Sequence, residues 1–127
     1  MAANATITLL ARKKMVRARA GEAVSLKIAG MAFGDGGADS SGEIIPASDA
    51  QTELNHELLR KPVDGHEFRD ETTCRYFCTL GNNELVGENI SEIALYDEDG
   101  DIVAIKNFRP KGKDDDLEMT FNIDDMF

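Results

Sequence analysis

The residues with the clearest chemical potential are four consecutive positions, Gly34-Asp35-Gly36-Gly37. Glycine-rich loops can bind phosphate because their backbone N–H groups approach a ligand closely. This loop lacks both the Gly-Lys-Ser/Thr ending of a P-loop and the G-x-G-x-x-G order of a dinucleotide site. Glycine also permits the positive φ of a tight turn. A turn without a ligand is therefore the favoured interpretation.

An acidic run from Asp97 to Asp101 could in principle bind calcium. Placing Gly100 at the sixth position of an EF-hand loop puts Leu95 at the first position and Lys106 at the twelfth, where oxygen ligands are required. The run therefore does not fit that motif. Its Asp-Gly pair between alternating apolar residues instead predicts a β-hairpin, with Asp99 and Gly100 as the two central residues of a type I′ turn.

Other groups that could act in catalysis or bind a metal are few. The cluster 114–116 is interpreted as a solvated acidic loop, and His56 and His66 have neither metal-ligand spacing nor a nucleophile elbow beside them. Cys74 and Cys78 are expected on one strand, about 13 Å apart at ~3.3 Å per residue, and a disulfide requires Cα atoms within about 7 Å. We therefore expect two reduced thiols, no cofactor, no metal and no enzymatic activity.

The net charge of -10 is distributed unevenly along the chain. Residues 1–20 carry five basic groups and no acidic ones, whereas the remaining residues carry nine basic and 24 acidic groups, a balance of -15. Such an acidic body repels phosphate, so nucleic acid is a poor partner. The basic segment is either a solvated helix or a docking segment for an acidic surface. No apolar run approaches the roughly 20 residues that span a bilayer, and the chain does not begin like a signal peptide.

The local patterns predict two helices. Residues 9–20 are dominated by good helix formers, mostly Ala, Arg, Lys and Met. Ser48 and Gln51 have the spacing of a capping box, and apolar residues recur at helical spacing after them. The second helix is therefore expected over about 49–60, because Pro62 blocks its continuation.

The rest of the chain favours strands. Alternation predicts a strand over 23–31, followed by a long glycine-rich loop over 31–45. The fold class is expected to be α+β: two helices with a mainly antiparallel β-sheet, in a single domain with a basic N-terminal helical arm (1–20) and an α+β body (21–127). The remaining strands are expected over 67–80, 84–97, 101–108 and 117–123.

Three strings add a family resemblance. M-A-F-G-D-G-G at 31–37 precedes Q-T-E-L-N-H-E at 51–57, and S-E-I-A-L-Y-D-E-D-G-D-I-V-A follows at 91–104. In this order and spacing the chain resembles the N-terminal domain of bacteriophage tail-collar fibre proteins, over roughly residues 12–123. The resemblance implies a structural component of a phage or prophage tail that attaches a fibre to the baseplate or collar, or acts as a short fibre or adaptor. It implies a place in the virion after assembly in the bacterial cytoplasm, and brings no catalytic residues with it.

The alternative is a small soluble bacterial domain that binds a ligand or regulates without catalysis. For the tail protein, the expected partners are other tail or baseplate proteins and further copies of the chain, with a trimer favoured by the resemblance. The basic arm of one copy is expected to meet the acidic body of another, and the loop 31–45 to lie near subunit contacts. The candidate motif and assembly residues are Met31, Phe33, Gly34, Asp35, Gly36, Gly37, Glu92, Tyr96, Asp99, Gly100, Arg12, Lys13 and Arg17.

Overall fold

A computed structural model describes residues 5–127, and in these residues the fold is mostly β. They form one helix and eight strands in two antiparallel sheets, so the expected α+β class with two helices is wrong. The elements in chain order are β1 (Thr6–Ile7), α1 (Leu9–Arg19), β2 (Ile28–Gly34), β3 (Glu57–Pro62), β4 (Gly65–Asp70), β5 (Thr73–Leu80), β6 (Asn89–Asp97), β7 (Ile102–Gly112) and β8 (Met119–Met126).

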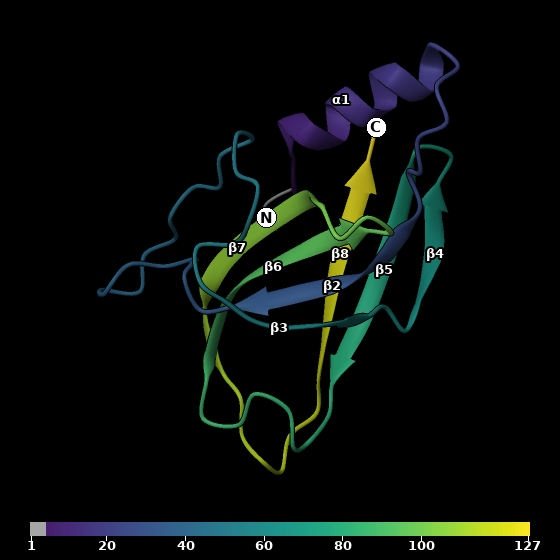
Figure 1. Ribbon diagram of the computed structural model, residues 1–127. Helices are drawn as coiled ribbons and strands as arrows, with labels where there is room; N and C mark the ends of the chain where they lie inside the picture. Colours follow the sequence, from purple (N-terminus) through teal and green to yellow (C-terminus); the bar gives the residue numbers. More distant parts are fainter. Residues whose placement is uncertain (1–4) are drawn as a thin grey trace.

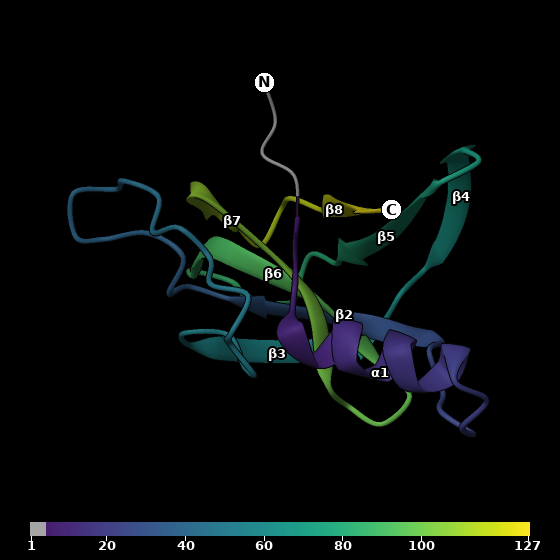
Figure 2. The ribbon, with the colours of Figure 1, turned by 90° about the horizontal axis from the view of Figure 1, so that it is seen from above.

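The two sheets form two layers with the core between them (Figures 1 and 2). One sheet has five strands in the order β1-β7-β6-β2-β3, and the other has three in the order β4-β5-β8. Side chains from both sheets share one apolar cluster, in which the rings of Phe33 and Phe121 meet edge to face at 5.4 Å. Burial of this shared face supplies the main stabilisation of the fold.

The first helix is confirmed. Thr8 is its N-cap and accepts a hydrogen bond from Ala11 N at 3.2 Å, while the Thr8 hydroxyl donates to Ile102 O at 2.9 Å. One side chain therefore caps the helix and fixes it to the start of β7. Within α1 only Ala11 is buried, and Gly21 follows with a φ of 93°.

The second expected helix is wrong. The capping-box contacts do form: Ser48 Oγ accepts from Ala50 N at 3.2 Å, and Gln51 Oε1 accepts from Ser48 N at 2.8 Å. The chain nevertheless makes only a turn there and becomes extended at Glu57, where β3 begins and pairs with β2. Pairing at the sheet edge outweighs the helical preference of this segment, since propensity is a weak determinant beside tertiary contacts.

The strand expected over 23–31 lies later in the chain. It is β2, which lies between β6 and β3, and it includes the first residues of the expected loop. Met31 and Phe33, at the start of the expected loop, are fully buried there and belong to the core of the single chain. The strand is buried at every position from 30 to 34, so it lacks the alternation that reveals a half-exposed strand.

The antiparallel strands of the C-terminal half are confirmed, with shifted ends. The segment expected as one strand over 67–80 is a hairpin, β4 and β5, which turns at Glu71 and Thr72. Cys74 and Cys78 both lie on β5 as free thiols, and Cys78 is fully buried. No helix among residues 5–127 is long and apolar enough to cross a membrane.

The hairpin between β6 and β7 forms at the expected place with a different turn. Gly100 has a φ of 84°, but Asp99 does not have the positive φ of a type I′ turn. Gly100 N donates to Asp97 O at 2.9 Å, so Glu98 and Asp99 are the central pair and the glycine follows them in the left-handed region. This is the turn followed by a left-handed residue that is common in three-residue hairpin loops.

Replacing Gly100 with Val is expected to lower the free energy of unfolding by about 1–3 kcal/mol, because a β-branched residue resists this positive φ. Gly112→Val is the matched control, since Gly112 has no positive φ and its Cβ position is uncrowded. Chemical denaturation measures both variants. Equal stability of the two would contradict the assigned turn.

Candidate functional site

Glu92, near the start of β6, lies at the junction of three segments. Its side chain is fully buried, and its two carboxylate oxygens accept hydrogen bonds from the backbone N–H groups of Gly36, Asn55 and His56, each at 2.8 Å. Backbone donors aimed at a carboxylate form strong charge-assisted hydrogen bonds. The carboxylate thus joins β6, the segment after β2 and the segment before β3, in which the three strings of the sequence motif lie. We name this arrangement the Glu92 junction.

Close approach of backbones explains the glycines of the junction. A Cβ on Gly34 would lie 2.4 Å from His56 O, and a Cβ on Gly37 would lie 2.0 Å from Ser91 O. Both contacts are far inside van der Waals distance and involve backbone atoms that cannot move aside. Glycine is therefore required by packing within the chain. The segment 34–37, expected to be a turn, is instead the end of β2 and the residues after it, packed closely against the backbone at His56 and Ser91.

His56 and Asp35 form an exposed pair at the rim of the Glu92 junction. His56 Nδ1 contacts Asp35 Oδ1, and this hydrogen bond raises the pKa of His56 above its ordinary value. The histidine side chain is 68% exposed, so the pair lies in solvent. No nucleophilic side chain is hydrogen-bonded to this imidazole among the described residues, so the pair lacks the arrangement of a catalytic base beside its nucleophile.

Tyr96 on the central strand β6 and the hairpin turn after it both contact Arg60 of the edge strand β3. The guanidinium of Arg60 lies 4.9 Å from the centre of the Tyr96 ring and donates from Nη1 to Gly100 O at 2.7 Å. The ring fills the space beside Gly30, where a Cβ would lie 2.2 Å from the phenol oxygen. Tyr96, Asp99 and Gly100 therefore belong to a second structural cluster on the same strand pair.

Lys14 lies among three aspartates of the hairpin, and the sequence alone did not reveal this contact. Its Nζ lies 2.6 Å from Asp97, 3.0 Å from Asp99 and 2.7 Å from Asp101. Burial tends to lower the pKa of Lys14, but the hydrogen bonds to Asp101, Asp97 and Asp99 outweigh it, and the pKa is raised. The carboxylate oxygens are grouped closely enough to hold a metal ion, and the lysine ammonium supplies the cation there.

The basic side chains singled out from the sequence are exposed. Arg12 pairs with Asp49 at 2.6 Å and Arg17 with Glu22 at 3.1 Å, all four being more than half exposed. Lys13 is exposed and forms no ion pair within residues 5–127. The arm is thus attached to the body of its own chain, mainly through residues that the sequence did not single out.

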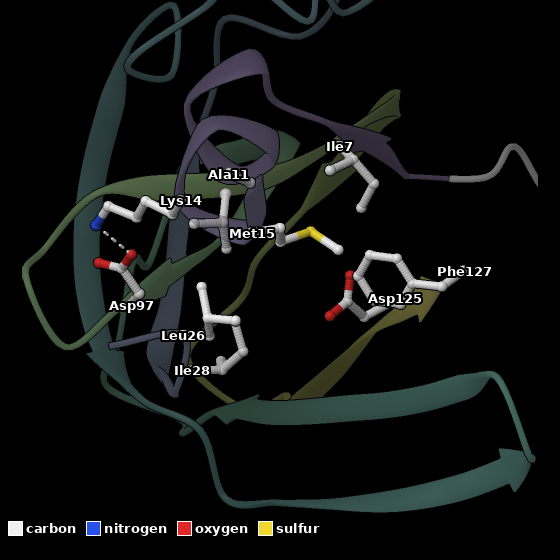
Figure 3. Close-up of a pocket in the computed structure, with 10 residues that line it drawn as sticks. Ile7, Ala11, Lys14, Met15, Leu26, Ile28, Asp97, Asp125 and Phe127 are labelled. Atoms are coloured by element: carbon white, nitrogen blue, oxygen red, sulfur yellow. Dashed lines mark hydrogen bonds and ion pairs between the residues drawn. The ribbon is translucent and has the colours of Figure 1, made fainter. Parts of the chain in front are cut away.

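A cavity of about 210 Å³ lies beneath α1 (Figure 3). It is mostly apolar, and Met15 from the helix and Phe127 from the chain end point into it. The Lys14–Asp97 pair lies at one side and the Asp125 carboxylate at the other. Burial in these surroundings raises the pKa of Asp125.

One family model matches most of the chain. Its description is "phage tail-collar fibre protein, N-terminal", and it matches residues 1–122. The comparisons with curated proteins and with solved structures return no match.

Replacing Glu92 with Gln is expected to lower the free energy of unfolding by roughly 2 kcal/mol, because an amide retains one acceptor oxygen and turns an N–H₂ group toward buried backbone donors. Glu53→Gln, at an exposed position, is the control and is expected to change stability by less than about 0.5 kcal/mol. Urea denaturation followed by circular dichroism measures both. Equal effects would contradict the role of the carboxylate.

Asp125→Asn is expected to stabilise the protein at pH 7. A folded-state pKa above the ordinary value of 3.8 means that stability falls as the pH rises from that value through the raised pKa. The neutral amide avoids this loss, so the gain should vanish near pH 3, where the wild-type carboxyl is protonated in both states. Thermal unfolding at a series of pH values measures the difference.

The matched control is Asp124→Asn. Asp124 lies 2.7 Å from Arg75, and this hydrogen bond lowers its pKa. Its contribution is present above the unfolded pKa and is lost as the pH falls through the folded pKa. This variant should therefore be less stable than the wild type at pH 7, the opposite sign. The same sign in both variants would refute the assigned environments.

Proposed function

The chain belongs to the phage tail-collar fibre protein family, and on that premise we propose that it is a structural element that attaches a fibre to the baseplate or collar of a phage tail, or serves as a short fibre or adaptor. The family supports a structural role in the phage tail. The convergence of the three motif strings on the Glu92 junction supports the proposal most directly, because the candidate polar groups of the motif hold backbone in place.

The junction also fixes the base of a protruding segment. Between β2 and β3 the chain extends away from the sheets (Figures 1 and 2). Ile44 and Ile45 are 45% and 38% exposed in this segment. A surface loop anchored on a rigid scaffold is the usual place for a binding surface, so this segment is proposed to contact another tail protein. Further copies of the chain are also proposed as partners, with a trimer favoured by the family resemblance.

The proposal is tested by electron micrographs of tail particles from phage with and without the gene. Particles that lack this chain are expected to lack their fibres. Wild-type protein should restore them, whereas Ile44→Asp should not, since it puts a charge on the proposed contact. Val86→Asp, at a position 47% exposed in another loop, is the matched control and should restore fibres. Full fibres on particles without the gene would overturn the proposal.

A further inference from the structure

The outer face of α1 is both apolar and basic. Leu9 and Val16 are 44% and 67% exposed there. Around them lie the exposed side chains of Arg12, Lys13 and Arg17, and these five residues line a shallow depression together with Ala20 and Glu22. Lone exposed apolar residues need no explanation, but apolar residues surrounded by an excess of one sign of charge, here three basic groups to one acidic group, mark a surface suited to a partner of the opposite charge. We name this surface the α1 face.

The charge of the α1 face is only partly neutralised by its own chain. Arg12 and Arg17 each pair with one exposed carboxylate, and exposed pairs of this kind are weak. Lys13 and Arg19 are exposed and form no ion pair within the described residues. A partner with several carboxylates can therefore bind here without breaking a buried contact.

A surface of matching chemistry lies on the same molecule, in the loop between β7 and β8. Its carboxylates are the exposed Asp114, Asp115, Asp116 and Glu118, and Leu117 among them is 42% exposed. No ion pair involves these four carboxylates within residues 5–127. We name residues 114–118 the acidic loop. The four exposed basic side chains of the helix, two of them weakly paired within the chain, thus equal in number the four acidic ones on the loop, and each surface carries at least one exposed apolar residue.

The two surfaces lie at opposite ends of the molecule (Figure 1). They cannot meet within one chain without unfolding it. We propose that the α1 face of one copy binds the acidic loop of a second copy, with Leu117 packed against Val16 and the carboxylates around Lys13 and Arg17. The inference rests on the proposed self-assembly and names the two surfaces that carry it.

One such contact leaves a free α1 face on one copy and a free acidic loop on the other. These either engage each other or recruit further copies. The contact must also overcome the repulsion between two chains that each carry a net charge of -10. Local complementarity of the two surfaces provides the attraction, and the apolar contact adds to it without dependence on salt.

The test is a charge exchange measured by sedimentation velocity over a concentration series. The wild type is expected to exceed the 13.9 kDa mass of one chain as concentration rises. A helix variant (Lys13→Glu with Arg17→Glu) and a loop variant (Asp115→Lys with Asp116→Lys) should each remain monomeric. Their mixture should associate again, because each then offers the surface that the other needs.

Two further variants test the effect of net charge alone and the contribution of the apolar contact. Glu53→Lys with Glu71→Lys makes the same change of net charge as the loop variant at exposed positions outside both surfaces, and should associate like the wild type. Leu117→Ser should weaken association without changing charge. Circular dichroism confirms that each variant is folded.

A wild type that stays monomeric at every concentration would overturn the inference and leave the role in the tail to the micrograph test. So would association that survives both charge reversals, or a mixture of the two reversed variants that fails to associate.

Discussion

Glu92 places a carboxylate where water is excluded, and it forms no ion pair within residues 5–127. Much of the fold is arranged around that group. Three backbone N–H groups from two distant segments replace the lost water. Burying an ionised group is costly unless its acceptors are filled. The segments that fill them must therefore stay close, and glycine at positions 34 and 37 permits the approach. The three motif strings are thus explained by one electrostatic requirement: the buried Glu92 carboxylate needs hydrogen-bond donors close to it.

In a second cluster of charged residues, the carboxylates are stabilised by a cation. The hairpin between β6 and β7 collects three aspartates, and their mutual repulsion is relieved by Lys14 from a helix far away in sequence. The same lysine secures the helix against the sheet, since α1 buries little apolar surface of its own. The two clusters differ in what stabilises the carboxylates: hydrogen bonds from neutral backbone N–H groups at Glu92, and the opposite charge of Lys14 at the aspartates.

Local signals predicted the elements that depend on local sequence. The Asp-Gly turn, α1 and the C-terminal antiparallel strands follow from turn chemistry, helix propensity and alternation. The segment after Ser48 shows where local signals fail. Its capping contacts form, but no helix follows, because the chain from Glu57 pairs with β2 as strand β3. The contact of Lys14 could not be predicted, since it joins residues more than 80 positions apart and its only trace was the alternation of Asp97, Asp99 and Asp101.

The double role of the Thr8 hydroxyl has a kinetic consequence. An isolated helix of 11 residues is marginal in water. This helix is capped by its own Thr8, and the same hydroxyl is anchored to Ile102 O at the start of β7, 94 positions away in sequence. Closing so long a loop costs conformational entropy before the contact can form and stabilise the chain. We therefore expect the helix to become ordered late in folding, on a sheet that already exists, and to lose its order early in unfolding.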